Sequence, residues 1–402
     1  MSLREFLFLI FFFYKEIFIF RINARNIRRR PLAKNKNFGV NLAGYLTAET
    51  GVGEGARSII RILEKTDIPF VLNNIRQRTA RSSDNVYSGR FGNDNPYCLN
   101  ILHVNADMVA YAANRLGLKW FRGRYNIGYW FWELDRFPER WRFSFECFNE
   151  VWVPSVFCRD CISKISPVPV IRMPPSIDIK LRSKYDRSLF GLYPDAFVLL
   201  SIFDLNSYSE RKNPFALISA FRDVFAGYSD RKVVLVLKFT GSRQNKKTSR
   251  EILKAVHGLP VKIIDNYLER DSVYGLISVS DCYVSLHRSE GFGLPLAEAM
   301  YIGKTVIATG YSGNMEFMNE KNSLPVKFVM KKIERTIGPY EKGNYWAEPD
   351  VKHAADLMRN VYENRDIAEN IGSAASKYMR ENFSPETLRV PLEQRLKGAL
   401  NY

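Results

Sequence analysis

The chain has 402 residues, 46% of them hydrophobic and 25% charged, which is typical of a globular protein of two or three domains and excludes a largely disordered one. Its 59 basic residues exceed the 42 acidic ones by 17, and this excess favours an anionic partner such as nucleic acid, anionic lipid or a phosphorylated small molecule. The five cysteines are odd in number and sparse, which argues against a disulfide framework and favours a reducing compartment. A single CxxC pair, Cys158 and Cys161, has no second pair or histidine nearby, so both are interpreted as structural thiols.

The first 36 residues differ from the rest of the chain. Their apolar run over residues 6–20 is interrupted by Lys15 and Glu16 and is followed by arginines. As a helix, this run would span about 22 Å, which is short of the roughly 30 Å hydrocarbon core of a bilayer. Basic residues outnumber acidic ones by seven in this segment, and their position after the apolar run is not that of a signal peptide. We therefore predict that residues 1–36 bind an anionic membrane surface, the alternative being a helix docked on the protein's own core.

Beyond this segment, strand-like apolar runs alternate with helical patterns, an alternation typical of βαβ units. A proline turn and a charged stretch over residues 173–187 divide the pattern into two halves. In the first half, strands are expected at residues 38–43, 70–72, 98–104, 127–132, 151–153 and 168–171. In the second half, they are expected at residues 197–202, 233–237, 261–264, 282–286 and 305–308.

These patterns predict an α/β protein with two doubly wound domains. The N-terminal domain covers residues 37–178, and the C-terminal domain covers residues 179–380. The last 22 residues, 381–402, are expected to pack back on the domains. In such folds, ligands bind beyond the carboxyl ends of the strands, so the loops that follow the predicted strands are the candidate binding loops.

Two candidate loops lie in the N-terminal half. The first is glycine-rich, and the backbone N–H groups around Gly51 and Gly53 can hold a phosphate at the start of a helix. It has no P-loop pattern, and the alternative is a glycine turn needed only for tight packing. The second loop carries His103 at the carboxyl end of a predicted strand, where the residue is either a ligand contact or a satisfied core histidine.

The third candidate loop follows the first strand of the C-terminal half. Its Arg211 and Lys212 can neutralise a diphosphate, arginine as a planar fork and lysine as a point charge. The alternative is an ordinary solvated basic pair. Because cations at a helix N-terminus oppose the helix dipole, we expect a compensating anion beside them.

The fourth candidate loop lies between a predicted strand and a helix that begins near Pro295. Gly291 and Gly293 allow positive φ and close approach of the backbone to a ligand. Two carboxylates, Glu290 and Glu298, flank this turn. Carboxylates accept hydrogen bonds from hydroxyl groups, so they favour hydroxyls over phosphates as partners.

Glu290 and Glu298 are separated by seven residues that include Gly-Phe-Gly-Leu-Pro, and this spacing resembles the E-x7-E element of the retaining glycosyltransferase family 4. The order of the segments 265–268, 281–286 and 303–316 is similar to that of the family, so the resemblance covers about residues 195–380. It implies a GT-B fold of two facing Rossmann-like domains, with the active site in the cleft between them.

The resemblance also implies roles for individual residues. Glu298 would bind the ribose hydroxyls of a nucleotide and Glu290 the hydroxyls of the transferred sugar. The family often carries an arginine five residues before the lysine, where this chain has Ser207, so Arg211 is the expected substitute. The expected catalytic residues are Glu290, Lys212, Arg211 and His103, and the expected nucleotide-sugar-binding residues are Glu298, Gly291, Phe292, Gly293, Leu294, Gly51 and Gly53.

The resemblance implies a retaining transferase that moves a sugar from a nucleotide-sugar donor to a glycan or lipid-linked glycan acceptor. Synthesis of a bacterial cell-surface polysaccharide or lipopolysaccharide is expected, in the cytoplasm or at the cytoplasmic face of the inner membrane. The chain has no Asp-x-Asp pair, so we expect no metal and no cofactor. The aromatic run over residues 129–138 is a candidate acceptor surface, with core and domain-interface packing as the alternative.

Two other functions stay open. The first is a nucleotide-sugar epimerase of the same fold, which needs no acceptor. The second is a nucleic-acid-binding protein, which the net charge suggests. We expect no nucleic-acid partner, because the chain lacks the aromatic and basic motifs of known modules and much of its charge lies in the first 36 residues.

Overall fold

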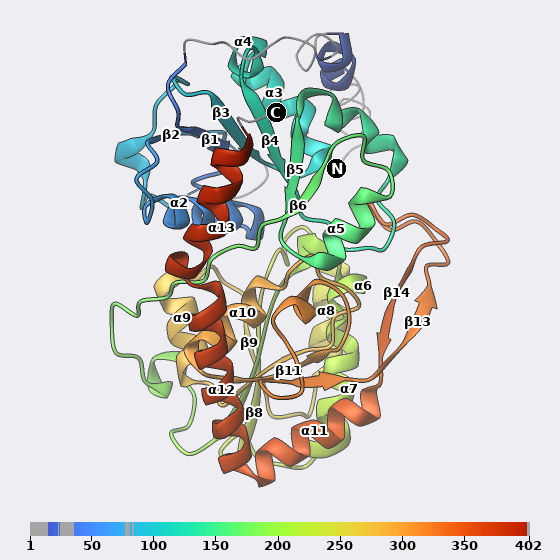
Figure 1. Ribbon diagram of the computed structural model, residues 1–402. Coiled ribbons are helices and arrows are strands. Elements are labelled where there is room, and N and C mark those ends of the chain that lie inside the picture. Colours follow the sequence, from blue (N-terminus) through green and yellow to red (C-terminus); the bar gives the residue numbers. More distant parts are fainter. Residues whose placement is uncertain (1–14, 23, 25–35, 77–80, 83, 400–402) are drawn as a thin grey trace. The chain divides into compact units, whose positions relative to one another are not determined.

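The computed structural model describes residues 15–22, 24, 36–76, 81–82 and 84–399. The chain forms two compact units (Figure 1). The N-terminal unit contains Met1–Trp132, Arg136–Ser176 and Pro385–Tyr402, and the C-terminal unit contains Glu133–Asp135 and Ile177–Ser384. Each unit has its own sheet and its own core. The predicted tail therefore belongs mainly to the N-terminal unit.

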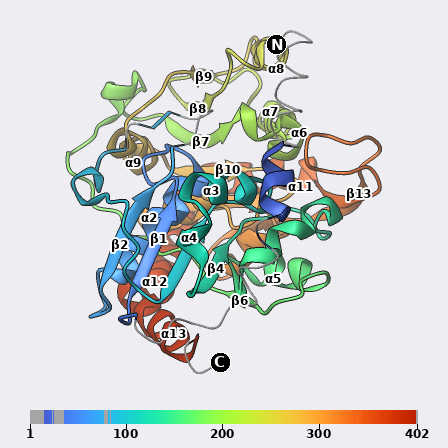
Figure 2. The same cartoon turned by 90° about the horizontal axis from the view of Figure 1, so that it is seen from above.

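The N-terminal unit is built on a six-stranded parallel sheet in the order β2-β1-β3-β4-β5-β6. Its strands are β1 (Val40–Gly44), β2 (Phe70–Asn74), β3 (Leu99–His103), β4 (Tyr125–Tyr129), β5 (Glu150–Val153) and β6 (Val170–Arg172). The strands β2 and β1 lie side by side in Figure 2. Continuous apolar runs form these strands because a parallel sheet is covered on both faces. The register places Gly44, His103 and Tyr129 level with one another at the carboxyl ends.

Helices cover this sheet and close the unit. They are α2 (Gly51–Leu63), α3 (Val109–Leu116), α4 (Leu118–Phe121), α5 (Val156–Ser163) and α13 (Pro385–Gly398), with the 3-10 turns η1 (Ser88–Arg90), η2 (Ala106–Met108) and η3 (Glu139–Cys147). The helix α13 returns from the end of the chain and packs on α2 (Figure 1). Its apolar face of Leu388, Leu392 and Leu396 joins the core beneath the sheet. Arg395 of this helix also pairs with the buried Glu150.

The helix over residues 15–22, which continues at residue 24, is the part of the N-terminal segment that the structure describes. Phe20 is fully buried and meets Phe143 edge to face, with ring centroids 6.0 Å apart. Phe18 and Ile22 are 68% and 58% exposed. This helix is therefore docked on one side, and its exposed side carries apolar residues together with the basic Lys15 and Arg21. Residues 1–14, 23 and 25–35, on which most of the membrane-anchor prediction rests, lie outside the described residues.

The aromatic run over residues 129–138 proves to be largely core. Trp130 is fully buried, with Phe137 stacked 5.8 Å from it, and Trp132 meets Trp141 edge to face at 5.1 Å. The rings of Trp130, Trp132 and Phe137 thus pack on neighbouring rings inside the N-terminal unit. Most of the rings in this run therefore serve core packing, whereas Phe131 is only partly buried, and the interpretation of the run as an acceptor surface stays a prediction.

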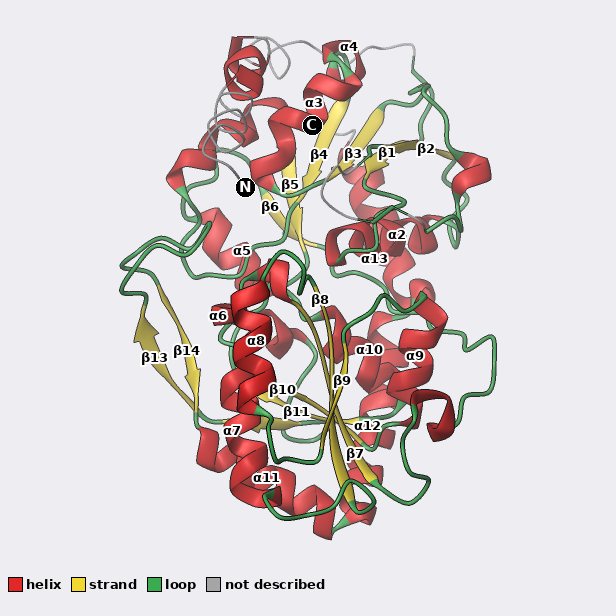
Figure 3. Ribbon diagram, turned by 180° about the vertical axis from the view of Figure 1, so that it is seen from behind, coloured by secondary structure: helices red, strands yellow, loops and turns green. Residues whose placement is uncertain are grey.

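The C-terminal unit has a second six-stranded parallel sheet, in the order β12-β11-β10-β7-β8-β9. Its strands are β7 (Phe197–Asp204), β8 (Val233–Thr240), β9 (Val261–Ile264), β10 (Cys282–Ser285), β11 (Thr305–Thr309) and β12 (Leu324–Val326). The helices are α6 (Ser209–Lys212), α7 (Pro214–Phe225), α8 (Lys246–Ala255), α9 (Arg270–Val279), α10 (Leu294–Ile302), α11 (Val351–Glu363) and α12 (Arg365–Phe383). Figure 3 shows α7, α8 and α11 on one side of the sheet and α9, α10 and α12 on the other. The predicted class, α/β with two parallel sheets, is confirmed.

A hairpin that the apolar pattern did not predict stands beside this sheet. Its strands β13 (Phe328–Lys332) and β14 (Tyr345–Pro349) pair antiparallel (Figure 1). The base of the hairpin is tied to the segment after β10, because Arg288 donates to both carboxylate oxygens of Glu348, at 3.0 and 2.7 Å. The guanidinium of Arg288 also lies 5.2 Å from the ring centroid of Trp346.

Candidate functional site

The loop after β10 follows a path fixed by the loop after β11. The N–H of Gly313 donates to the carbonyl of Glu290 at 2.8 Å, and the N–H of Glu290 donates to Ser312 Oγ at 2.8 Å. A Cβ at Gly313 would overlap the carbonyl of Gly291, so only glycine fits there. Ser312 holds a φ of 77°, which a non-glycine residue adopts only under strain. The two loops thus form one braced structure at the carboxyl edge of the sheet.

Three of the four predicted catalytic residues meet in this braced region. Glu290 Oε1 lies 2.5 Å from Lys212 Nζ and 3.0 Å from Arg211 Nη1. Arg211 also donates to the carbonyl of Ser289 at 2.8 Å. The side chains of Arg211 and Glu290 are only 4% and 12% exposed. Glu290 is thus the anion that we expected beside the basic pair, but the predicted helix-start position is wrong, because Arg211 and Lys212 lie in the last turn of α6.

The charges in this cluster shift one another's pKa. Burial by itself would raise the pKa of Glu290, but attraction to Arg211 and Lys212 outweighs it and lowers the pKa to about 2. For Lys212, burial lowers the pKa and Glu290 offsets only part of that effect. For Arg211, burial would lower the pKa, but Glu290, Tyr340 and Glu133 together raise it. At neutral pH Glu290 is therefore a carboxylate held between two basic groups.

Glu133 and Tyr340 extend the cluster; Glu133 belongs to the run over residues 129–138 that was predicted as an acceptor surface, whereas Tyr340 was not predicted as a site residue. Arg211 Nη2 lies 3.9 Å from Glu133 Oε1, and the Arg211 guanidinium lies 6.0 Å from the ring centroid of Tyr340. Tyr340 donates to Glu133 Oε2 at 3.5 Å although the two residues are 207 positions apart. Ser289 Oγ donates to the carbonyl of Glu133. All of these residues belong to the C-terminal unit.

Glu298 lies in α10, where it meets α9 instead of the Glu290 cluster. It is 6% exposed, and its carboxylate lies 3.2 Å from Arg270 Nη1 and 3.4 Å from the hydroxyl of Tyr274. The Arg270 guanidinium is 5.6 Å from the Tyr274 ring centroid. Neither Arg270 nor Tyr274 was predicted as a site residue, because both lie within an ordinary helical pattern.

The residues between the two glutamates anchor the turn. Gly293 has a φ of +90° and is the N-cap residue of α10, as the need for a positive φ predicted. Phe292 is a core residue, 1% exposed, with its ring 5.0 Å from that of Phe317 and 6.0 Å from that of Phe383. Leu294 is the first residue of α10 and is also buried. Only the backbone of Phe292 can therefore serve a ligand, as the resemblance implied.

His287, which was not predicted as a site residue, links the loops after β10 and β11 a second time. Its Nε2 is 3.0 Å from Asn314 Oδ1, and its Nδ1 is 3.1 Å from Ser285 Oγ. Burial lowers the pKa of His287 to about 4, so the ring is neutral at pH 7. A neutral ring that donates from Nε2 and accepts at Nδ1 satisfies both contacts.

The remaining predicted residues lie in the N-terminal unit. His103 ends β3, is fully buried and stacks on Tyr129 with ring centroids 4.2 Å apart. Among the described residues, neither ring nitrogen has a hydrogen-bond partner, and burial lowers its pKa to about 3. A Cβ at Gly55 in α2 would lie 2.9 Å from this ring, so the glycine-rich helix start and His103 are neighbours.

Gly51 and Gly53 open α2. The N–H of Gly53 donates to Thr50 Oγ1 at 3.2 Å, and a Cβ at Gly53 would overlap the carbonyl of Ala48. This N–H is therefore satisfied within the protein, and tight packing by itself requires a glycine here. Binding of the donor by Gly51, Gly53 and His103 stays a prediction.

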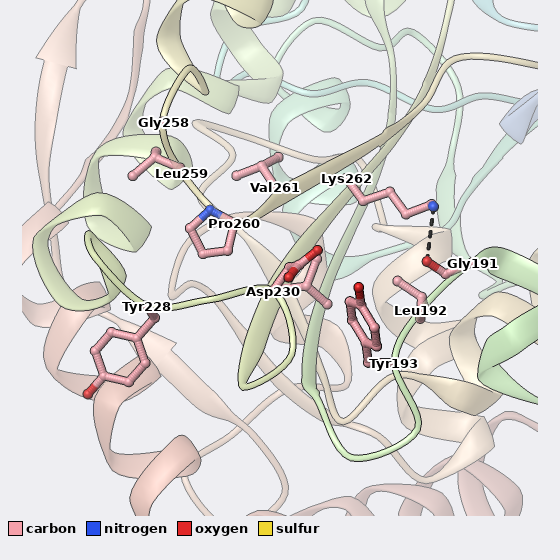
Figure 4. A pocket seen from close by; sticks show the side chains of 11 residues that line it. Gly191, Leu192, Tyr193, Tyr228, Asp230, Gly258, Leu259, Pro260, Val261 and Lys262 are labelled. Carbon is pink, nitrogen blue, oxygen red and sulfur yellow. Dashed lines mark hydrogen bonds between the residues drawn. The ribbon is translucent and has the colours of Figure 1, made fainter.

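A hollow of about 420 Å³ lies elsewhere in the C-terminal unit (Figure 4). Gly191, Tyr193, Gly258 and Lys262 are among its lining residues, and Lys262 Nζ donates to the carbonyl of Gly191 at 3.1 Å. The hollow borders the amino ends of β8 and β9, at the opposite edge of the sheet from Glu290. Because ligands of doubly wound sheets bind at the carboxyl ends, we do not assign it to the site.

The described part of the chain offers neither a cluster of metal ligands nor a membrane-spanning helix. It contains no group of three or more histidines, cysteines, aspartates or glutamates placed to hold a metal ion. Cys158 and Cys161 are buried and form no disulfide. No helix among the described residues is both long and apolar enough to cross a membrane.

Comparison with known proteins places these observations in a family context. Residues 198–378 match the family model "Glycosyl transferases group 1". A search of curated proteins gives no significant match. The fold is similar to that of Anabaena HepE in complex with UDP-glucose, with a TM-score of 0.63, 16% identity and coverage of 90% of this chain and 100% of that one.

Two further solved structures share this fold. Sucrose-phosphate synthase from Thermosynechococcus elongatus has a TM-score of 0.66 and 13% identity, covering 91% of this chain and 100% of the other. A glycosyltransferase from Rickettsia africae has a TM-score of 0.59 and 16% identity, covering 90% and 99%. These similarities confirm the predicted GT-B fold. The family match spans the unit that carries Glu290, Glu298, Arg211 and Lys212.

Proposed function

We propose that this chain, a glycosyltransferase by the family match of its C-terminal unit, transfers a sugar from a nucleotide diphosphate donor to a glycan or lipid-linked glycan acceptor with retention of configuration. The observation that carries the proposal is the cluster of Glu290, Arg211 and Lys212 at the turn before α10. Because Anabaena HepE binds UDP-glucose, a uridine donor is the first candidate to test.

The cluster supports a direct exchange of partners on donor binding. A diphosphate is a stronger partner for Arg211 and Lys212 than one carboxylate, because it offers more charge and more acceptor oxygens. Glu290, which now neutralises the two basic groups, would then accept hydrogen bonds from the hydroxyls of the transferred sugar. The same three side chains thus pair with one another before the donor binds and pair with the donor afterwards.

The same arrangement supplies the chemistry of the transfer. Negative charge develops on the departing nucleoside diphosphate, and the fixed groups of Arg211 and Lys212 stabilise it there. The backbone N–H groups at the start of α10 add to this field. Positioning of donor and acceptor supplies the rest of the rate enhancement. In a same-face attack, a donor phosphate oxygen can take the acceptor's proton, so no separate protein base is required.

Glu298 is proposed to bind the ribose hydroxyls, and its removal tests the donor site. We expect a UDP-sugar to raise the melting temperature of the wild type, and Glu298→Ala to weaken donor binding about 100-fold, since each hydrogen bond to a charged group contributes about 1.5–3 kcal/mol. Thermal shift against UDP, GDP and ADP sugars measures this. Glu363→Ala, which removes an exposed carboxylate of the same unit, is the matched control. An equal response of Glu298→Ala and wild type would contradict the assignment.

Retention and metal independence are proposals that one product analysis tests. We expect NMR of the product to show the anomeric configuration of the donor, and we expect a chelator to leave the rate unchanged. An inverted product or loss of activity with the chelator would overturn these proposals. Incubation with donor alone separates transfer from epimerisation, because a transferase leaves the sugar configuration unchanged without an acceptor.

The cellular setting is also proposed. The net charge of the first 36 residues and the exposed Phe18 and Ile22 support binding to an anionic membrane surface, where a lipid-linked acceptor would be found. We expect the full chain to sediment with vesicles that contain anionic lipid and to do so less in high salt. Equal sedimentation with neutral vesicles would refute the electrostatic part of this proposal.

A further inference from the structure

The N-terminal unit contains a hollow of about 720 Å³ that none of the predicted site residues touches. It lies between the carboxyl end of β2, with the residues that follow it, and the helices α3 and α4. Its size falls within the range of about 300–1,000 Å³ that is usual for ligand sites. None of its lining residues is acidic, and they include Asn73, Asn74, Arg76, Tyr111, Arg115 and Trp120.

Asn73 and Trp120 are the most buried polar and aromatic side chains of this lining, each 4% exposed. Trp120 Nε1 donates to Asn73 Oδ1 at 3.1 Å, and Asn73 Nδ2 donates to the carbonyls of Gly92 and Asp94 at 2.9 and 3.0 Å. Each polar group of this pair therefore has a fixed partner. The hollow thus has a preorganised wall and is not a gap left by loose packing.

Two guanidinium groups border the same hollow. The Arg115 guanidinium lies 5.1 Å from the ring centroid of Tyr111, and the Tyr111 hydroxyl donates to the carbonyl of Arg76 at 3.3 Å. Within the part of the chain that the structure describes, neither arginine forms an ion pair with a carboxylate. The hollow therefore presents positive charge that the described residues do not neutralise.

This combination of groups matches one class of ligand. The exposed amides of Asn74 and Asn93 and the guanidinium groups can donate hydrogen bonds to sugar hydroxyls, and arginine binds a carboxylate through two parallel bonds. Aromatic side chains offer apolar faces for sugar rings. We propose that the hollow binds an acidic oligosaccharide, one that carries carboxylates on its sugar rings. That this oligosaccharide forms part of the acceptor rests on the proposed transferase function, whereas its binding to the hollow does not.

Binding to the full chain without nucleotide tests this proposal. Isothermal titration with tetragalacturonate is expected to show binding at least about tenfold tighter than with neutral maltotetraose, because only the acidic sugar can pair with the guanidinium groups. The double variant Arg76→Gln/Arg115→Gln should lose at least tenfold in affinity for tetragalacturonate. Arg159→Gln/Lys164→Gln, which removes one charge from α5 and one from the residue that caps its C-terminus, should retain it.

A second variant covers the case in which the double variant does not fold. Asn74→Asp changes an exposed residue of the hollow and adds a negative charge there, so it should also weaken binding of tetragalacturonate. Absence of binding to the wild type, equal affinity for the two oligosaccharides, or an equal loss in the α5 control would overturn the proposal. Because no nucleotide is present, each of these results leaves the proposed sugar transfer untouched.

Discussion

Lys212→Met is expected to lower the rate of sugar transfer by about 10²–10³, the loss that follows removal of one preorganised group at a developing negative charge. The Lys212 ammonium lies 2.5 Å from Glu290, and in our proposal it moves its interaction to the departing diphosphate. Methionine keeps most of the chain's length and apolar contacts but supplies no charge. Glu290 retains Arg211 as its partner, so the fold should persist.

Steady-state kinetics with the donor identified by thermal shift measures this effect. Lys247→Met is the matched control, because it removes a lysine that is 90% exposed on α8 of the same unit. We expect the control to keep the wild-type rate. A Lys212→Met variant that folds as the wild type does and keeps its rate within about threefold, a difference of well under 1.4 kcal/mol, would remove Lys212 from the reaction.

The parts of the site that the sequence predicted are those with a local signal. The apolar run of β10, the glycine turn and Pro295 define a strand, a turn and a helix in one short stretch. The basic pair Arg211 and Lys212 led us to expect an anion, and Glu290 supplies it, although the pair ends α6 instead of lying at a helix start. The rhythm of strands and helices likewise sufficed for two parallel sheets, because buried parallel strands consist of continuous apolar runs.

The parts that were missed depend on contacts between distant positions. Glu133 and Tyr340 meet although 207 residues separate them, and neither has a local pattern that distinguishes it from a surface residue. The hairpin that carries Tyr340 between its strands has exposed residues throughout β13, so no alternation of apolar and polar residues indicated a strand. The role of His287 was missed because its partner Asn314 comes from the next βα loop.

The aromatic run at residues 129–138 shows a different limit of sequence reasoning. Aromatic side chains serve both sugar binding and core packing, and composition alone does not separate the two. The separating fact is burial, since Trp130 is fully enclosed by neighbours such as Phe137, which follows it by only seven residues. In the hollow of the same unit, by contrast, amides and arginines accompany the aromatic side chains.

Arg211→Met is expected to destabilise the C-terminal unit by about 3–5 kcal/mol, the usual effect of removing one partner from a buried charge cluster. Arg211 is 4% exposed and holds Glu290, Glu133 and the carbonyl of Ser289. Without it, Lys212 alone faces Glu290, and Glu133 loses its cation. Scanning calorimetry should show the melting transition of this unit about 10 °C lower.

The pH dependence of this loss distinguishes an electrostatic cause from a packing cause. In the wild type, the pKa of Glu290 is lowered to about 2, well below its value of about 4.3 in an unfolded chain. The stability that this shift contributes is therefore fully present above about pH 5 and is lost as the pH falls toward 2. The effect of Arg211→Met on the free energy of unfolding should be smallest at low pH. The difference in stability between the variant and the wild type therefore narrows from pH 7 to pH 3.

The double variant Arg211→Met/Glu290→Leu completes the test. If Arg211→Met lowers the melting temperature because it leaves Glu290 buried with too little positive charge, removing that carboxylate as well should restore part of the melting temperature. A simple cavity at position 211 would instead give additive losses and a gap that does not change with pH. The electrostatic outcome would show that Glu290 and the basic groups stabilise one another in the absence of donor. In the proposed reaction, the donor diphosphate replaces Glu290 as the partner of these basic groups.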